Sequence, residues 1–272
     1  MPLLWLRVAT AFYGFGLLHA FIALTRRSES LSRIIMPVMG FGFVFHFVSL
    51  TEGFIQAGSI FPASVHHSES ILGFLLMVFV FGAFLRSRNN AFGIFVFPVV
   101  FLLTFSAAIG QQPPQFTSPV LRNGWIAIHV ALIFTGYAGL FFSFGASLLY
   151  LVQQRSLKTK QTSSGLLSRL PALEMIDQIG YRALLLGFPF MTFGLVAGAV
   201  IAQATFGPTY FHDPKIVLSV LMWVVYVVLL YMRWSAGWRG RRAAYVSAFA
   251  FTTALVVWLA NNFSVVHKFV ER

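Results

Sequence analysis

The chain has 272 residues, of which 58% are hydrophobic, 17% are aromatic and only 10% are charged. Soluble domains carry roughly a quarter charged residues, so this composition excludes a soluble globular protein, and the mean hydropathy of +0.81 agrees. Cysteine is absent, which excludes disulfides, thiol redox chemistry, thiolate metal sites and attachment of a cofactor through C-x-x-C-H. The meaning of the net charge of +12 depends on where the charges lie.

Eight apolar segments follow one another along the chain, each close to the length of about 20 residues that a helix needs to cross a bilayer. They are predicted at Val8–Leu24, Ile34–Phe54, Ile71–Leu85, Phe92–Ile109, Trp125–Val152, Ala183–Ala204, Ile216–Met232 and Ala243–Phe263. The polar connection Gln153–Arg182 is predicted to carry a separate surface helix around Leu170–Tyr181. The pattern predicts an all-α integral membrane protein with eight transmembrane helices in a single polytopic domain over residues 1–272.

Most of the 19 lysine and arginine residues lie in the loops after the first, third, fifth and seventh segments. These residues are Arg26, Arg27, Arg33, Arg86, Arg88, Arg155, Lys158, Lys160, Arg169, Arg182, Arg233, Arg239, Arg241 and Arg242. The opposite side of the membrane holds Arg7, Arg122, Lys215, Lys268 and Arg272. Because basic loops stay in the cytoplasm, both termini are predicted to lie outside. The excess of positive charge is thus explained by the orientation of the chain in the membrane, and no nucleic-acid partner is expected.

Histidines are the main ionisable side chains in or near the predicted spans, where such side chains are costly and are candidates for function. His46 lies inside the second span, His129 lies one turn into the fifth, and His267 follows the eighth. Neutral imidazole is a good iron ligand, and two histidines on facing segments commonly bind haem iron from both sides. A lone histidine near a membrane interface is also explained by a hydrogen bond there, and His19 is interpreted in this way.

His129 and His267 are predicted to lie at the same outer face, and the aromatic loop Phe206–Lys215 lies between them in the sequence. Trp125 precedes His129 by four residues and shares its helix face. Such a place suits a flat apolar macrocycle whose carboxylates meet Lys215, Arg122 or Lys268. An ordinary interfacial belt also explains the aromatic residues, so both interpretations stay open at this point.

Several other classes of function lack the residues that they need. With only seven acidic residues in the chain, His46 and Glu52 give poor support to a proton-coupled transporter. The motifs G-x-x-x-x-G-K-[ST], H-E-x-x-H and G-x-S-x-G are all missing. Nucleotide hydrolysis, zinc proteolysis and serine hydrolysis are therefore not expected.

Several short stretches together resemble the cytochrome c assembly protein family, which includes the CcsA and CcmC haem-handling proteins and their HemX and YpjD-like relatives. They are Trp125-Ile-Ala-Ile-His129, Gly136-Tyr137-Ala138, Ser143-Phe144, Ala146–Leu151, Leu170–Glu174 with Asp177, Tyr181-Arg182, Gly194-Leu195 with Gly198-Ala199, and Gly237–Gly240 with Arg242–Ala244. Upstream, His46, Phe61-Pro62 and Glu69-Ser70 resemble the HemX and YpjD-like branch. The resemblance covers nearly the whole chain, with the family core at about residues 71–263.

The family signature is an outer loop of the form W-G-x-Y-W-x-W-D-P-K-E, which is associated with haem. The corresponding run here is Phe206–Ile216, which keeps the glycine at position 207 and the Asp-Pro-Lys at positions 213–215. Phe206, Tyr210 and His212 replace the three tryptophans, and an isoleucine replaces the final glutamate.

The resemblance implies a set of haem contacts. His129 and His267 match the family's two outer-face iron ligands, and His46 matches its intramembrane histidine. The further contacts implied with non-covalent haem b are Trp125, Tyr210, Phe211, His212 and Asp213.

The resemblance also implies a function in cytochrome c maturation, in which the protein presents or relays haem at the outer face as a carrier and not as an enzyme. The expected partners are haem, other cytochrome c maturation membrane proteins and the lipid bilayer, and the expected location is the bacterial cytoplasmic (inner) membrane. Two alternatives stay open. One is a HemX-like membrane regulator of haem biosynthesis that delivers no haem, and the other is a di-haem b-type electron carrier, which needs two pairs of axial histidines.

Overall fold

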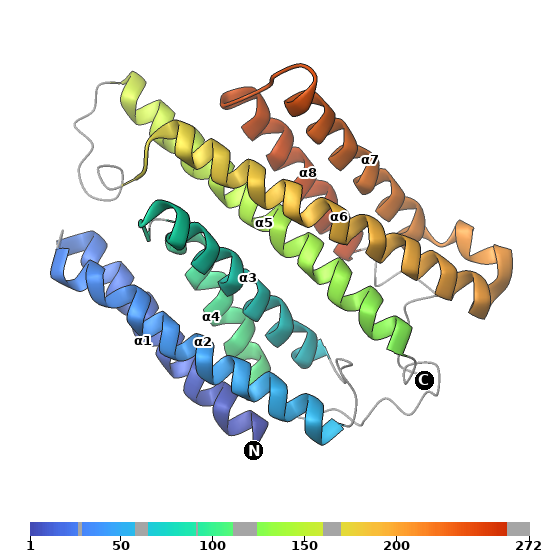
Figure 1. Ribbon diagram of the computed structural model, residues 1–272, viewed down its shortest axis with the longest axis horizontal. Coiled ribbons are helices and arrows are strands. Elements are labelled where there is room, and N and C mark those ends of the chain that lie inside the picture. The colour runs from blue at the N-terminus through green and yellow to red at the C-terminus, as the bar shows by residue number, and fades with distance from the viewer. Residues whose placement is uncertain (27–28, 58–64, 91, 111–123, 160–169, 260–272) are drawn as a thin grey trace. The chain divides into compact units, whose positions relative to one another are not determined.

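The computed structural model describes residues 1–26, 29–57, 65–90, 92–110, 124–159 and 170–259, and over these residues it contains helices and no β-strand (Figure 1). The α-helices are α1 Pro2–Arg26, α2 Glu29–Ala57, α3 Val65–Ser87, α4 Gly93–Ile109, α5 Gly124–Lys158, α6 Leu173–Phe206, α7 Pro214–Trp234 and α8 Arg241–Leu259. A short 3₁₀ helix, η3 Gly207–His212, connects α6 with α7. The all-α prediction is confirmed, and each predicted apolar segment coincides with a helix over its described residues.

The predicted separate surface helix around Leu170–Tyr181 is wrong, because α6 runs without a break from Leu173 to Phe206. Proline at position 171 lies before the first turn of α6, and the helix continues through position 182 without interruption. Buried positions recur every three or four residues from Ile176 through Gly187 to Met191, so one buried stripe continues across the expected break. The polar first turns therefore extend the sixth span instead of forming a helix of their own.

Six helices among the described residues are long and apolar enough to cross a membrane. The candidate spans are Pro2–Ala23, Arg33–Gln56, His66–Ser87, Ile128–Lys158, Leu173–Phe206 and Pro214–Trp234. Helix α4 has 17 residues, which at 1.5 Å per residue spans about 25 Å, and α8 carries Arg241 and Arg242 in its first turn. The chain is thus a multi-pass membrane protein, while eight crossings and outward-facing termini stay predictions.

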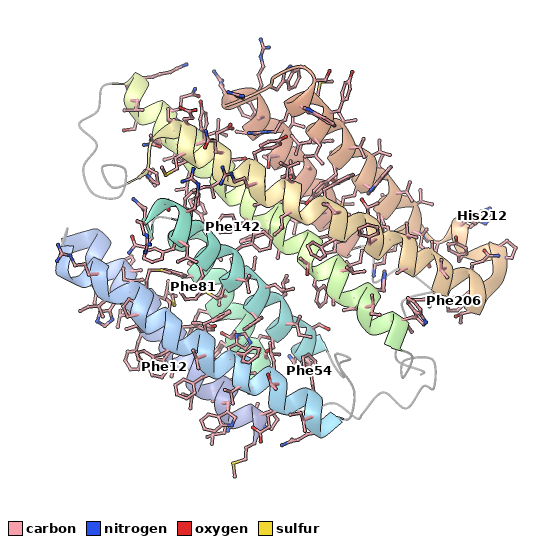
Figure 2. All side chains as sticks on the ribbon, viewed as in Figure 1. Phe12, Phe54, Phe81, Phe142, Phe206 and His212 are labelled. Carbon is pink, nitrogen blue, oxygen red and sulfur yellow. The ribbon has the colours of Figure 1, made fainter. Side chains whose placement is uncertain are left out.

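The chain divides into two compact units, one of Met1–Gln115 with Val152–Met175 and one of Phe116–Leu151 with Ile176–Arg272. In the first unit, α1 packs against α2 and α4, and α3 packs against α4. A Cβ atom added at Gly42 would lie 2.8 Å from the Tyr13 ring, so this glycine lets α1 and α2 approach closely. Figure 2 labels Phe12 on α1, whose ring stacks on Phe45 of α2 at a centroid distance of 5.5 Å.

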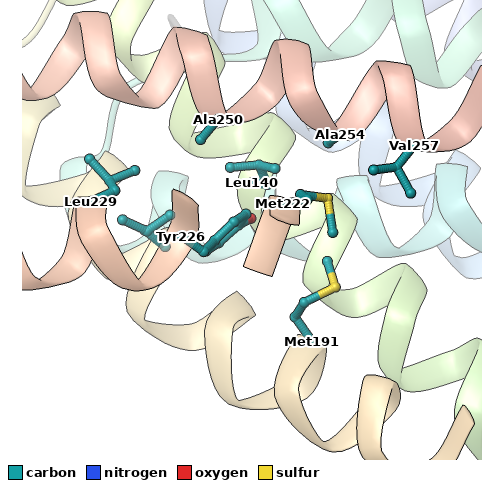
Figure 3. Packing of buried hydrophobic residues seen from close by; sticks show 9 residues of the cluster. Leu140, Met191, Met222, Tyr226, Leu229, Ala250, Ala254 and Val257 are labelled. Carbon is teal, nitrogen blue, oxygen red and sulfur yellow. The ribbon is translucent and has the colours of Figure 1, made fainter. Parts of the chain in front are cut away.

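The core of the second unit is a cluster of buried side chains from α5, α6, α7 and α8, with Leu140, Met222 and Tyr226 near its centre (Figure 3). Small residues bring α5 and α6 together beside this cluster. A Cβ atom added at Gly139 would lie 2.8 Å from the carbonyl oxygen of Ala183 and 2.9 Å from Cα of Gly187. Backbones this close need glycine at the contact, and the contact holds the middle of α5 against α6.

A mostly buried ion pair lies near the start of α6 in the second unit. The Arg233 guanidinium donates to the two carboxylate oxygens of Asp177 at 2.7 and 3.1 Å and lies 4.6 Å from the centre of the Tyr181 ring. The backbone N–H of Gly240 donates to the same carboxylate at 3.2 Å. Gly240 has a φ of +63°, and an added Cβ atom would meet the hydroxyl of Tyr150, so glycine is required there. The pair therefore connects α6 to the turn between α7 and α8.

Candidate functional site

The side chain of His129 lies on the face of α5 that packs against α6. Its Nδ1 is 2.7 Å from the carbonyl oxygen of Gly194. Because a carbonyl oxygen only accepts hydrogen bonds, Nδ1–H donates, and in the neutral ring the lone pair then belongs to Nε2. The half-buried ring thus holds the tautomer whose Nε2 can bind a metal ion.

Two glycines of α6, one turn apart, shape the space around this ring. A Cβ atom added at Gly198 would lie 2.5 Å from Cε1 and 2.7 Å from Nδ1 of His129. A Cβ atom added at Gly194 would lie 2.9 Å from Cδ1 and 3.1 Å from the backbone nitrogen of Ile133. The imidazole therefore occupies a notch that exists because α6 carries no side chain at position 198, and Gly194 lets the next turn of α5 come close to α6.

The loop that corresponds to the family signature contains η3 and presents aromatic side chains outward. Phe206 is 44% exposed and Phe211 is 59% exposed, whereas Tyr210 is only 5% exposed. The rings of Tyr210 and Phe211 lie against each other, with their centroids 4.1 Å apart. His212, labelled with Phe206 in Figure 2, is also exposed. Phe206 and Phe211 are thus exposed in this loop, and Tyr210 packs against Phe211 from the buried side.

The start of α7 connects this loop to the histidine. Asp213 is the N-cap of α7, its carboxylate accepts the backbone N–H of Lys215 at 3.0 Å, and Pro214 is the first helical residue. The charge of Lys215 acts electrostatically on His129. Trp125, one turn before His129 on α5, is 64% exposed. The same unit therefore holds the histidine, a basic group that acts on it electrostatically, and exposed aromatic rings.

His46 belongs to the first unit and is completely buried. Its Nε2 lies 2.9 Å from Oγ of Ser70, and its Nδ1 lies 3.3 Å from the hydroxyl of Tyr13. The rings of Tyr13 and Phe74 meet it edge-on. Both ring nitrogens of His46 thus have hydroxyl partners within the bundle, and an iron atom would have to displace one of them.

The remaining histidine predictions have different outcomes. His267 lies outside the described residues. Among the described residues, no group of three or more histidine, aspartate and glutamate side chains could hold a metal ion. His19 is hydrogen-bonded, as expected, through Nδ1–H to the carbonyl oxygen of Phe15 at 2.9 Å.

Sequence comparisons place these features within a known family. The profile described as Cytochrome C assembly protein matches residues 64–267, which include His129, the loop and the position of His267. The chain belongs to the cytochrome c assembly protein family. Among its members, the cytochrome c biogenesis protein CcsA of Guillardia theta is 30% identical over 240 residues, covering 79% of this chain and 78% of that protein.

Two other members of the cytochrome c assembly protein family show how far the similarity extends. CcsA of Heterosigma akashiwo (strain NIES-293 / 8280G21-1) is 28% identical over 241 residues, which is 75% of this chain and 74% of the relative. CcsA of Prochlorococcus marinus (strain MIT 9215) is 31% identical over 163 residues, which is 53% of each chain. The predicted resemblance to this family is confirmed. His46 lies before the residues that the family profile matches.

Sequence reasoning missed the partners of the two histidines. Gly194 and Gly198 are among the stretches that carry the family resemblance, but their role beside His129 was not foreseen. Their spacing of four residues on one helix was the available signal, because it places both on one face. Nothing in the sequence paired Tyr13 or Ser70 with His46, since these contacts depend on how three helices pack.

Proposed function

We propose that this protein is a haem-binding membrane protein of cytochrome c maturation and that Nε2 of His129 is one of its iron ligands. The observation that carries the proposal is the hydrogen bond from Nδ1 of His129 to the carbonyl oxygen of Gly194, which leaves the Nε2 lone pair for a metal ion. Membership of the cytochrome c assembly protein family and similarity to proteins named for cytochrome c biogenesis support the pathway.

The residues around His129 have the chemistry that haem requires. Haem supplies an iron that binds imidazole, an apolar ring and two carboxylates. The exposed rings of Phe206, Phe211 and Trp125 cover apolar surface, and the ammonium group of Lys215 pairs with a carboxylate. We assign the second iron ligand to His267 and a separate part in haem loading to His46. In this proposal haem is cargo, and the protein carries it without catalysing a reaction.

The proposal also includes the topology. Eight crossings with both termini outside would put His129, the loop Phe206–Lys215 and His267 at the outer face of a bacterial inner membrane. Topology reporters fused after Arg88, Lys160 and Arg239 should report cytoplasm. Fusions after Ala63, Gln115 and Lys268 should report the outer side. A cytoplasmic signal at Lys268 would contradict the pairing of His129 with His267.

The visible absorption spectrum of the purified protein tests the function directly. We expect about one non-covalent haem per chain in a low-spin state, because two imidazoles bind the iron. The His129→Ala variant should lose the low-spin spectrum and regain it when imidazole is added. Wild-type protein that contains no haem, and that shows no spectral change on titration with haemin, would overturn the proposal. Two haems per chain would indicate the di-haem electron carrier instead.

A second candidate function is regulation of haem biosynthesis without haem delivery. The observation in its favour is the signature loop, where Phe206, Tyr210 and His212 replace all three tryptophans. For this candidate we expect haem-free protein and a change in the amount or activity of an early haem-biosynthesis enzyme when the gene is deleted. For the carrier, deletion should lower cytochrome c and leave that enzyme unchanged.

A further inference from the structure

We infer that Gly194 and Gly198 are positioning residues that fix both the tautomer and the direction of the His129 ring, so that Nε2 is the nitrogen presented to iron. The inference rests on the proposed function for its last step, the binding of iron. The step before it, the choice of tautomer, is a property of the haem-free protein. The two steps can therefore be tested separately.

The hydrogen bond of His129 reaches a carbonyl group in the middle of a helix. Helix α6 continues through position 198, so the carbonyl of Gly194 already faces the N–H of Gly198 in the regular helical pattern. A carbonyl oxygen has two lone pairs and can accept a second hydrogen bond from the side. The Nδ1–H of His129 makes that second bond at 2.7 Å.

The side approach is open only because residue 198 is glycine. An added Cβ atom would lie 2.5 Å from Cε1, 2.7 Å from Nδ1 and 3.3 Å from Nε2 of His129. Three ring atoms lie close to this position, so a small shift of one flexible atom cannot relieve the overlap. The ring would have to rotate away, and the rotation would separate Nδ1 from the carbonyl oxygen of Gly194.

Gly194 has a different part, which is to set the distance between the helices. An added Cβ atom there would lie 2.9 Å from Cδ1 and Cγ1 and 3.1 Å from the backbone nitrogen of Ile133, one turn after His129 on α5. Because the backbone of α5 is among these close contacts, a shift of the Ile133 side chain alone would not make room, and a side chain at position 194 would push α5 and α6 apart. The carbonyl of Gly194 would then move out of reach of the imidazole.

The hydrogen bond has a direct consequence for metal binding. A histidine that donates one ring N–H to a fixed carbonyl is held in the tautomer whose other nitrogen binds the metal ion. Loss of such a partner commonly lowers metal affinity about 10–100-fold. We therefore expect the Gly198→Ala variant to bind haem about 10–100-fold more weakly than the wild type.

The first experiment uses haem-free, ¹⁵N-histidine-labelled full-length protein in detergent, with the His129→Ala variant to assign the signal. In the wild type, Nδ1 of His129 should be protonated and Nε2 should not. In Gly198→Ala, the signal should show both tautomers. The matched control is Gly82→Ala on α3, where an added Cβ atom has nothing within 4 Å, and it should leave the His129 signal unchanged.

The second experiment measures haem affinity and spin state by titration with haemin. Gly198→Ala should weaken binding and shift the spectrum toward high spin, and Gly82→Ala should match the wild type. A wild-type tautomer together with wild-type affinity in Gly198→Ala would overturn the inference. Wild-type protein that takes up no haem would instead overturn the proposed function, while the tautomer measurement would still decide the role of the glycines.

A double variant covers the case in which Gly198→Ala lowers stability so much that little folded protein is obtained. Since the added methyl group meets the ring of His129, removing that ring should relieve the overlap. We expect Gly198→Ala to lower the thermal midpoint in the wild-type background and to have little effect in the His129→Ala background. Equal losses in both backgrounds would show that Gly198 does not act through His129.

Discussion

Each of the two units of this protein holds a histidine against neighbouring helices, but the hydrogen-bond partners of the two imidazole rings differ. In the first unit, His46 is completely buried and both of its nitrogens meet hydroxyl groups, from Tyr13 and Ser70. In the second unit, His129 is half-buried, and one nitrogen meets the backbone carbonyl of Gly194. The first arrangement uses the ring as a structural connector, and the second leaves a lone pair in a defined direction.

The difference follows from the kind of partner. A hydroxyl group can donate or accept, so the partners of His46 can adapt to either tautomer and they satisfy the ring completely. A carbonyl oxygen only accepts, so the partner of His129 selects one tautomer. A histidine that binds iron needs one fixed N–H donor and one free lone pair, as a carbonyl partner provides. Residue type and position within the predicted span therefore do not distinguish His129 from His46.

The largest effect on stability is expected at the ion pair between Asp177 and Arg233 in the second unit. Asp177 lies on α6, far from the contact that this helix makes with His129 at Gly194. In Asp177→Ala, the guanidinium of Arg233 keeps its burial and loses its carboxylate, and the N–H of Gly240 loses its acceptor. Breaking a mostly buried pair from one side should cost on the order of 3 kcal/mol. Thermal unfolding in detergent measures this loss.

The spectrum of haem-loaded Asp177→Ala sharpens the comparison between the two ends of this unit. It should match the wild type at temperatures where the variant is folded, because the pair does not contact His129. A changed spin state in folded Asp177→Ala would mean that this pair also sets the geometry at His129.

Replacing the two histidines should separate stability from haem binding. His46→Ala leaves the hydroxyls of Tyr13 and Ser70 without their partner and opens a cavity, so we expect a loss of about 2–3 kcal/mol in the free energy of unfolding. His129→Ala removes one hydrogen bond at a half-buried site and should cost about 1 kcal/mol. Unfolding in increasing concentrations of denaturant measures both changes.

The haem titration of the same two variants should give the reverse order. His129→Ala should change the spin state, and His46→Ala should alter the amount of haem loaded and leave the spin state unchanged. If His46→Ala were the variant that changes spin state, the roles assigned to the two histidines would be exchanged.

The aromatic loop provides a smaller and more local effect. Phe211 is exposed and Tyr210 is buried beneath it, so removing Phe211 disturbs the packing of η3 less than removing Tyr210. We expect Phe211→Ala to keep the wild-type unfolding midpoint and to lose about 1–2 kcal/mol of haem binding energy. Haem occupancy at equal concentrations measures the loss.

Val217, on the adjoining helix α7, offers a control for Phe211. It is also an exposed hydrophobic side chain, and Val217→Ala should leave haem occupancy unchanged. Wild-type occupancy in Phe211→Ala would show that the loop is an interfacial belt and would favour the regulatory function.

The sequence predicted the fold well because apolar segments of bilayer length are long and strong signals. The start of α7 at Asp213 and Pro214 rests on local capping chemistry, which is the kind of signal that a sequence contains. Sequence reasoning placed a helix boundary near residue 182 incorrectly, because polar composition does not end a helix whose buried stripe continues. Long-range contacts such as His129 with Gly194 join residues on different helices, and a single sequence does not contain their pairing.

The smallest expected effect comes from Ser70→Ala, which makes His46 resemble His129 in its hydrogen bonding. The variant removes the hydroxyl at Nε2 of His46 and keeps the hydroxyl of Tyr13 at Nδ1, so the cost should be about 1 kcal/mol. The haem spectrum should stay that of the wild type, because His46 is 0% exposed and a lone pair without access binds no iron. Ser49→Ala, on the same helix as His46, removes a hydroxyl bonded to a backbone carbonyl and serves as the control for stability. An additional haem in Ser70→Ala would show that hydrogen bonding alone, without burial, distinguishes the two histidines.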